Sequence, residues 1–451
     1  MTSRARTLSR LIMPTNPRRG VRGPALEPTP QRLLMPGEYR APEGDELDER
    51  ELAALAAERP LVRASGTGPF PGTSLAEAMA RIEGELGAPH LPYLPQLPAA
   101  GWKGTATART LAICEGIAFD GASFGWRMVH STGRGARESA LAEDRLLSTI
   151  NLLADRVGSR ASGRRTFEQA GGEAPTRPVY KVQLTGPLSL AAQVYLPGGE
   201  RAMSDVGASR DLLDSFLEGM ERWFILLREA LQSPNTPLAV QFDEPEFQRL
   251  LEGSIPTVSG FRTLPALDPH VYREVYRRLV ERCTDLNLQV ILNIDGTGVK
   301  PLRAPKVSVK PAPSLDALEL LKTIMQTVAK PDLSCALMLH PDRSRPRGAG
   351  MLHVPPLSDP RSWEPVAQLV DAGARVWLPV VTEEMVPHQA RRLFSLWREV
   401  GLEVRQLSSV GLMPDDARLP AGGYASLSLT EATASLTRVT ECARALGECG
   451  V

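Results

Sequence analysis

The sequence is poor in cysteine, has no excess charge of either sign and contains no long apolar run. Its cysteines (Cys114, Cys283, Cys335, Cys442 and Cys449) are scattered and never fall in a CxxC spacing. That spacing excludes a disulfide framework and a cysteine-rich metal site, and it indicates a reducing compartment. Because 52 basic residues balance 52 acidic ones, nothing in the overall charge indicates nucleic-acid binding. We therefore expect a small-molecule ligand or a protein partner.

Membrane and nucleotide signals are missing as well. No apolar run approaches the roughly 20 residues that span a bilayer, and no signal-peptide core follows the arginine-rich N-terminus. The sequence also lacks a complete dinucleotide fingerprint, a P-loop, an HExxH motif and a GxSxG motif. We expect a soluble, cytoplasmic protein that does not bind membranes or nucleic acid.

Composition divides the chain into an arm and a barrel-forming part. Residues 1–60 are rich in Arg, Pro and Glu and have few aromatic residues, so we expect a disordered arm. Residues 61–451 alternate short β-type runs with amphipathic stretches, which is typical of a parallel α/β sheet. An insertion at about 90–175 interrupts this alternation. Within it, Glu138–Val157 has the spacing of one long helix, which we expect to cover part of the barrel mouth.

The number of β-type runs favours a closed (β/α)8 TIM barrel, which needs eight strands. Amphipathic stretches separate most of these runs. The predicted strands are Ser65–Phe70, Tyr180–Thr185, Leu238–Phe242, Leu288–Asn293, Lys306–Lys310, Ser334–His340, Val376–Val381 and Glu403–Leu407.

Two adjacent carboxylates, Asp243 and Glu244, follow the apolar run in TPLAVQFDEP. The carboxyl ends of parallel strands open onto the ligand crevice, so both acids are candidate functional residues. The alternative is that Asp243 caps the following helix, with Pro245 in its first turn. The local sequence leaves both interpretations open.

Four segments in order resemble the catalytic barrel of cobalamin-independent methionine synthase. They are GTGPFPGT (66–73), VQLTGPLSL (182–190), QFDEP (241–245) and SSVGLMP (408–414), and the similarity extends over roughly residues 62–447. The resemblance implies a (β/α)8 barrel in which a zinc-bound homocysteine thiolate accepts a methyl group from a folate donor.

The zinc ligands of that family do not match this sequence. Its His-x-Cys pair aligns with Asn293 and Asp295, its glutamate with Lys310, and its last cysteine with Val410. An ammonium group in place of a carboxylate ligand repels a divalent cation. We therefore expect no zinc, and no other cofactor.

The substrate-binding positions of the family are partly kept. Its serine after the first glycine reads Gly68-Pro69, which removes the hydroxyl that would hold a substrate carboxylate. Asp243 matches the contact with the substrate amine. By this resemblance the expected substrate-binding residues are Gly68, Thr185, Asp243 and Glu244.

These residues leave two main roles open. The chain is either a non-catalytic barrel that binds a small amine-bearing ligand or a protein partner, or a metal-free enzyme whose catalytic residues are Asp243, Asp295 and Lys310. In the first role Lys310 and Asp295 form an ion pair, and in the second Lys310 reacts, for example by forming a Schiff base. A third alternative is methyl transfer to a thiol with zinc held by other residues.

Overall fold

The computed structural model describes residues 59–129, 137–169, 179–232, 237–293, 333–336, 338–339, 353–354, 363–381, 384–415 and 426–449. All of them belong to one compact unit, Leu55–Val451. The predicted arm over residues 1–60 lies almost wholly outside the described residues. So do the predicted strand Lys306–Lys310 and the candidate Asp295.

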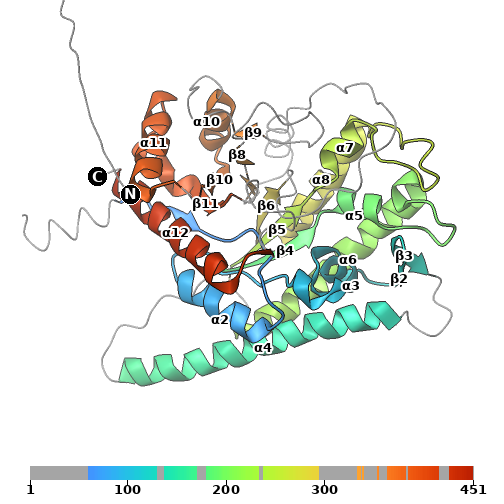
Figure 1. The fold of residues 1–451 in the computed structure, drawn as a ribbon, viewed down its shortest axis with the longest axis horizontal. Coiled ribbons are helices and arrows are strands. Elements are labelled where there is room, and N and C mark those ends of the chain that lie inside the picture. Colours follow the sequence, from blue (N-terminus) through green and yellow to red (C-terminus); the bar gives the residue numbers. More distant parts are fainter. Residues whose placement is uncertain are drawn as a thin grey trace, which may run out of the picture. The chain divides into compact units, whose positions relative to one another are not determined.

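Helices alternate with parallel strands along most of the described chain (Figure 1). The strands are β1 (Arg63–Ala64), β2 (Ala118–Ala122), β3 (Gly125–Val129), β4 (Tyr180–Thr185), β5 (Leu238–Asp243), β6 (Leu288–Asn293), β7 (Leu333–Ala336), β8 (Met338–Leu339), β9 (His353–Val354), β10 (Arg375–Val380) and β11 (Val410–Pro414). The α-helices are α2 (Leu75–Glu85), α3 (Ala106–Ile113), α4 (Arg137–Gln169), α5 (Pro187–Gln193), α6 (Val206–Ala230), α7 (Phe247–Leu251), α8 (Pro269–Asp285), α10 (Glu364–Asp371), α11 (Val386–Glu399) and α12 (Leu429–Glu448). Short 3-10 helices are η1 (Pro98–Ala100), η2 (Trp102–Gly104), η3 (Ala202–Ser204) and η5 (Val404–Ser409).

The main sheet has seven parallel strands in the order β1-β11-β10-β7-β6-β5-β4. Its two edge strands are joined through the extended segment Leu91–Gln96. The backbone N–H of Leu91 donates to the carbonyl of Ala64 on the β1 side at 2.9 Å, and that of Leu94 donates to the carbonyl of Lys181 in β4 at 3.0 Å. Backbone hydrogen bonding therefore continues from β1 through this segment to β4.

Side chains alternate between the two faces of each strand, as the β period of two requires. In β4, Tyr180, Val182 and Leu184 pack outward into the main core together with residues of the surrounding helices. The other face is enclosed by the sheet and contains a small apolar cluster, which consists of Leu91, Ala239, Ile291, Trp377 and Met413. Polar side chains occupy the same inner face near the carboxyl ends of β4, β5 and β6.

Most of the predicted strands are confirmed, some to the residue. The strand predicted at Ser65–Phe70 is wrong: β1 is Arg63–Ala64, and the chain that follows leaves the extended conformation at Gly68, whose φ is +130°. Tyr180–Thr185 and Leu288–Asn293 are strands β4 and β6 as expected, and β5 is one residue longer than its prediction. The strand predicted at Glu403–Leu407 is wrong. That segment begins η5, because Glu403 and Gln406 form a capping box. The strand is the next segment, Val410–Pro414, within the SSVGLMP motif.

Segment Leu91–Gln96 was not predicted to take part in the sheet, because it falls in the insertion expected at about 90–175. Proline has no backbone N–H, so it weakens a strand only at positions where a backbone N–H has to donate a hydrogen bond to the neighbouring strand. Here Leu91, Leu94 and Gln96 make the donations, while Pro92 accepts a hydrogen bond from the Lys181 N–H at 2.8 Å. Farther around the sheet, β7 pairs directly with both β6 and β10. β7 therefore follows β6 in the sheet, the place that the prediction gave to Lys306–Lys310.

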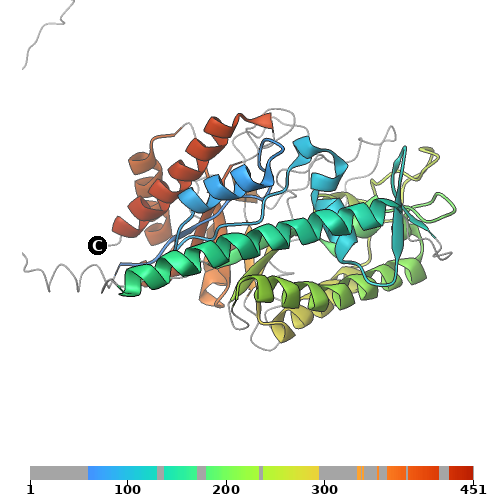
Figure 2. The ribbon, with the colours of Figure 1, turned by 90° about the horizontal axis from the view of Figure 1, so that it is seen from below.

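The long helix predicted in the insertion is confirmed and extended. It is α4 (Arg137–Gln169), which extends beyond the predicted range at both ends and farther at its carboxyl end (Figure 2). Its later turns are tied to the amino end of β4. Arg160 donates to a carboxylate oxygen of Glu83 at 2.8 Å, and the Tyr180 hydroxyl donates to the other oxygen of Glu83 at 2.8 Å. This part of α4 therefore lies away from the barrel mouth that we expected it to cover.

Candidate ligand site at the carboxyl ends of the strands

Asp243 ends β5, between the last residues of its two neighbours. The strand register pairs it with Thr185 of β4 on one side and with Asn293 of β6 on the other. Asp243 is only 2% exposed. The structure therefore brings together two predicted site residues, Asp243 and Thr185, with Asn293 beside them.

Two side-chain amides hold one oxygen of the Asp243 carboxylate. Gln241 donates from Nε2 to Oδ1 at 2.8 Å, and Asn293 donates from Nδ2 to the same atom at 2.6 Å. No other described residue donates to the Asp243 carboxylate, so Oδ2 receives no hydrogen bond from the described part of the chain. The Asp243 side chain also does not cap helix α7, so the capping alternative is wrong.

A buried lysine lies behind this pair of residues. Lys181 of β4 is fully buried, and its Nζ donates to the carbonyl of Gly66 at 2.5 Å and to Oε1 of Gln241 at 2.6 Å. The ammonium therefore orients the Gln241 amide so that its oxygen faces Lys181. The amide nitrogen is left to donate to Asp243, and also to the carbonyl of Thr67 at 3.0 Å.

Burial dominates the acid–base behaviour of Asp243. Loss of solvation raises the pKa of its carboxyl from 3.8 to about 7, although the hydrogen bonds from Gln241 and Asn293 and the charge of Lys181 all lower it. The carboxyl is thus held near the midpoint of its titration at neutral pH. A group in this state responds strongly to a cation that binds beside it.

Glu244 faces a different element from Asp243. Its two carboxylate oxygens accept the backbone N–H groups of Leu188 at 3.2 Å and of Ser189 at 2.7 Å, at the start of α5. At Gly186 a Cβ atom would lie 2.3 Å from Oε1 of Glu244, so only glycine fits against this carboxyl. Burial raises the pKa of Glu244 to about 7. The carboxylate is engaged in capping α5, and its predicted contact with a substrate stays a prediction.

Gly68 makes room for another polar side chain. Its φ is +130°, and a Cβ atom there would lie 2.9 Å from Cγ of Gln183. Gln183 is fully buried on the inner face of β4. Within the described part of the chain, neither its amide nitrogen nor its amide oxygen has a hydrogen-bond partner, and the Thr67 hydroxyl has none either.

Two of the positions that align with the family's zinc ligands, Asn293 and Val410, lie among the described residues. Asn293 uses its side-chain nitrogen as a donor to Asp243, so this amide faces another protein group. Val410 is the first residue of β11 and lies at the amino end of that strand, the end opposite to Asp243. Aligning the last family cysteine with Val410 therefore placed it at the end of the sheet opposite to the candidate site. Asp295 and Lys310 lie outside the described residues. The described ranges contain no cluster of three or more His, Cys, Asp or Glu side chains suited to a metal.

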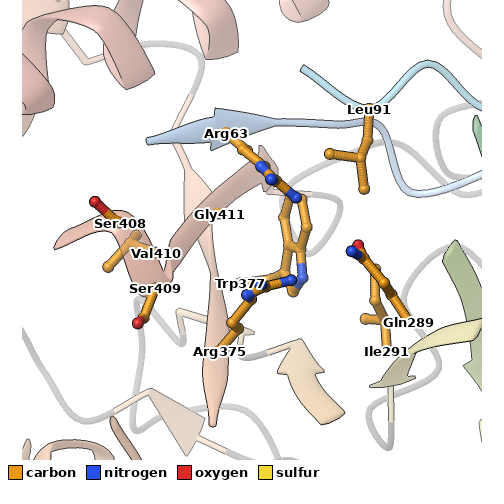
Figure 3. Close-up of a pocket in the computed structure, with 10 residues that line it drawn as sticks. All are labelled: Arg63, Leu91, Gln289, Ile291, Arg375, Trp377, Ser408, Ser409, Val410 and Gly411. Carbon is orange, nitrogen blue, oxygen red and sulfur yellow. The ribbon is translucent and has the colours of Figure 1, made fainter. Parts of the chain in front are cut away.

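A small pocket lies at the opposite end of the sheet (Figure 3). Arg63, Arg375 and Val410, the first residues of their strands, are among its lining residues, and the indole of Trp377 lies between the two arginines in the view of Figure 3. The pocket encloses about 10 Å³, which is room for one water molecule. It is too small for a substrate, and the candidate site remains the carboxyl ends of the strands.

Three important site residues were missed in the sequence: Lys181, Gln183 and Gln241. A signal for them is present. KVQLT and AVQFD are both apolar strands that carry a glutamine at the same register position. A buried strand with polar residues at every second position indicates a polar interior, and that pattern was available from the sequence.

Comparison with known proteins finds similarity to solved structures. No protein-family model matches it, and no curated protein sequence matches it. A B12-independent methionine synthase from Shewanella sp. W3-18-1, solved in complex with selenomethionine, is 12% identical with a TM-score of 0.46, and the match covers 85% of this chain and 97% of that one. A GH5-4 broad-specificity endoglucanase from an uncultured bacterium is 8% identical with a TM-score of 0.32, covering 86% and 95% of the two chains. A Bacteroidetes-affiliated GH5 cellulase linked with a polysaccharide utilization locus is 10% identical with a TM-score of 0.29, covering 86% and 93%.

Likenesses of this size carry no argument about function, so the functional argument rests on the geometry of the site. Among the described residues, no helix is both long and apolar enough to cross a membrane. The cytoplasmic location stays a prediction.

Proposed function

We propose that the chain is a (β/α)8 barrel, diverged from cobalamin-independent methionine synthase, that binds a small amine-bearing ligand without zinc. Segment Leu91–Gln96 takes the place of the eighth strand of the barrel, between β1 and β4. The observation that carries the proposal is the carboxylate of Asp243, which is held through Oδ1 by two amides and receives no donor at Oδ2 from the described residues. An ammonium group of a ligand supplies that donor.

The electrostatics of the site favour a cation. A carboxyl with a pKa of about 7 is only partly ionised at neutral pH, and a bound ammonium stabilises the ionised form and lowers that pKa. Charge-assisted hydrogen bonds of this kind are stronger than neutral ones. A carboxylate that is 2% exposed suits a small molecule better than a flat protein surface, so we place a protein partner second. The resemblance in sequence supports the same assignment, because Asp243 matches the residue that contacts the substrate amine.

The test compares two neutralised carboxylates. Asp243→Asn keeps an oxygen that accepts from Gln241 and Asn293 but replaces Oδ2 by an NH2 group, which repels an ammonium. Glu83→Gln is the matched control, because Glu83 is a buried carboxylate at the amino end of β4. Thermal unfolding at pH 8 is measured with increasing 2-aminoethanol, propylamine or L-methionine.

We expect at least one of these amines to raise the unfolding midpoint of the wild type and of Glu83→Gln, but not of Asp243→Asn, because ligands stabilise the state that binds them. Equal stabilisation of Asp243→Asn, or no stabilisation of the wild type by any of the amines, contradicts the proposal.

A metal-free enzyme is the second candidate, and the pKa of Asp243 favours it. A carboxyl that titrates near pH 7 is suited to general acid–base catalysis. In this case Asp295 and Lys310 act with Asp243. Lys310→Met separates the roles of the lysine. A catalytic lysine is dispensable for stability and amine binding, whereas an ion-pair lysine lowers the unfolding midpoint when it is lost.

Zinc content decides the third candidate, methyl transfer to a thiol. Elemental analysis of the purified protein, without added metal and after removal of any His-tag, measures it directly. Protein zinc sites bind the metal tightly enough to keep it through purification. About one zinc per chain would therefore make methyl transfer to a thiol the favoured function. Absence of zinc leaves the amine-binding barrel as proposed.

A further inference from the structure

Gln183 is a buried amide without a partner, next to the proposed amine site. It lies on the inner face of β4, directly across from Gln241 in the strand register, and is fully buried. Neither amide atom has a hydrogen-bond partner in the described part of the chain. Buried polar groups in native proteins nearly always have a partner, and leaving one unpaired is costly.

The surroundings of Gln183 favour a binding surface over a packing defect. The hydroxyl of Thr67 is buried and likewise has no partner among the described residues. Gly68, with its φ of +130° and no Cβ, leaves the space that the Gln183 side chain fills. The backbone carbonyl of Thr67 accepts from Gln241, the residue that also holds Asp243. Residue Thr67 is therefore linked to the carboxylate of Asp243 through the side chain of Gln241.

We propose that Gln183 and Thr67 bind a neutral hydroxyl or amide group carried by the same ligand whose ammonium binds Asp243. The inference rests on the proposed function and narrows its ligand to an amine with a hydrogen-bonding group a few bonds away, such as an amino alcohol. Gln183 offers both a donor and an acceptor, and so does the Thr67 hydroxyl. A hydroxyl or an amide on the ligand satisfies both kinds of atom.

A neutral group fits here better than a carboxylate. Among the described residues on this part of the inner face, Lys181 is the cation, and its Nζ already donates to Gly66 and Gln241. A ligand carboxylate at Gln183 would lie close to the carboxylate of Asp243 without a described cation of its own, which is unfavourable at low dielectric. A hydroxyl avoids that repulsion.

The experiment uses two amines that differ in one group. 2-Aminoethanol and propylamine carry the same ammonium and have nearly the same shape, but one ends in a hydroxyl and the other in a methyl. Their affinities are obtained from the dependence of the unfolding midpoint on concentration, in the wild type, in Gln183→Leu and in Asp243→Asn. Gln183→Met replaces Gln183→Leu if the leucine variant does not fold, as judged by circular dichroism.

In the wild type we expect 2-aminoethanol to bind about tenfold more tightly than propylamine, the size of one buried hydrogen bond. In Gln183→Leu that ratio falls towards one, while the affinity for propylamine is kept. Equal affinities in the wild type, or an unchanged ratio in Gln183→Leu, overturn the inference.

The same measurements separate this inference from the proposed function. If both amines bind the wild type equally and Asp243→Asn abolishes both, the amine site stands and the Gln183 subsite falls. If neither amine stabilises the wild type, the inference falls, and the proposed function falls with it when L-methionine does not stabilise the wild type either. If binding does not depend on Asp243, both fall.

Discussion

The side-chain nitrogen of Gln241 donates to Oδ1 of Asp243 at 2.8 Å, while the oxygen of the same amide accepts from Lys181 at 2.6 Å. Gln241 thus connects a fully buried ammonium deep in the sheet to the carboxylate at the strand end. The direction of the amide is determined by the lysine, because an ammonium is only a donor. Lys181 is therefore a positioning residue for Asp243.

Replacing Lys181 by Met tests this connection. The methionine keeps the apolar stem and removes the charge, so the pKa of Asp243 loses one of the influences that lower it and rises. Amine binding then requires a higher pH than in the wild type. The measurement is the pH midpoint of stabilisation by 2-aminoethanol or propylamine. Lys103→Met, which changes a lysine that lies over the Trp102 ring, is the control. An unchanged midpoint in Lys181→Met refutes the positioning role.

The buried carboxyls make stability depend on pH in an unusual direction. Asp243 and Glu244 have folded pKa values of about 7, above their ordinary values of 3.8 and 4.5. The folded state therefore binds more protons than the unfolded state between about pH 4 and pH 7, and stability falls as the pH rises through this window. The free energy of unfolding of the wild type, measured in urea, should fall by on the order of 2 kcal/mol per carboxyl between pH 5 and pH 8. Asp243→Asn removes one of these contributions, so its pH dependence should be flatter; an identical slope in both proteins counts against a raised pKa.

Local patterns predicted the elements that depend on local residues. Strands β4 and β6 alternate or run continuously apolar between turns, and they are found where the sequence indicates them. Leu91–Gln96 was assigned to the insertion and not to the sheet, because only its partners in the neighbouring strands show that its backbone joins the sheet. Glu403–Leu407 was mistaken because its residues also suit a strand, and the capping box that decides against one was overlooked.

The candidate site divides in the same way. Asp243 was found because an acid at the end of an apolar strand is a local signal. The roles of Gln183, Gln241 and Lys181 depend on the register between β4 and β5, which brings residues 60 positions apart into contact. The helix cap that the sequence suggested for Asp243 is made by its neighbour Glu244, and the capped helix is α5 of the preceding βα unit.

The capping role of Glu244 predicts a loss of stability in Glu244→Gln. Glutamine offers one acceptor oxygen to the N–H groups of Leu188 and Ser189, and its own NH2 group then faces the second donor. We expect a loss of about 1–3 kcal/mol at pH 5, the cost of an unsatisfied buried donor. At pH 8 the loss is smaller, because the variant no longer buries a charge. Urea unfolding at both pH values measures the difference, and a larger loss at pH 8 than at pH 5 would contradict this account.

Gly68 and Gln183 are coupled through space, which a double-mutant cycle can measure. Gly68→Ala introduces two costs: a φ of +130° that L-residues rarely adopt, and a Cβ only 2.9 Å from Cγ of Gln183. We expect it to destabilise the wild type by about 2–4 kcal/mol. In Gln183→Ala the Cγ atom is gone, so the same substitution should cost only the backbone strain, about 1–2 kcal/mol.

Gly72→Ala is the control for that cycle, because Gly72 has a φ of +87° and a Cβ there would meet its nearest neighbour, Leu429, at 3.4 Å. Gly72→Ala introduces backbone strain without a contact to Gln183. The free energy of unfolding that it costs should therefore be the same in the wild type and in Gln183→Ala. Free energies of unfolding in urea for the single and double variants provide both comparisons. If Gly68→Ala costs the same in the two backgrounds, the side chain of Gln183 does not occupy the space beside Gly68, and its placement in the proposed subsite is wrong.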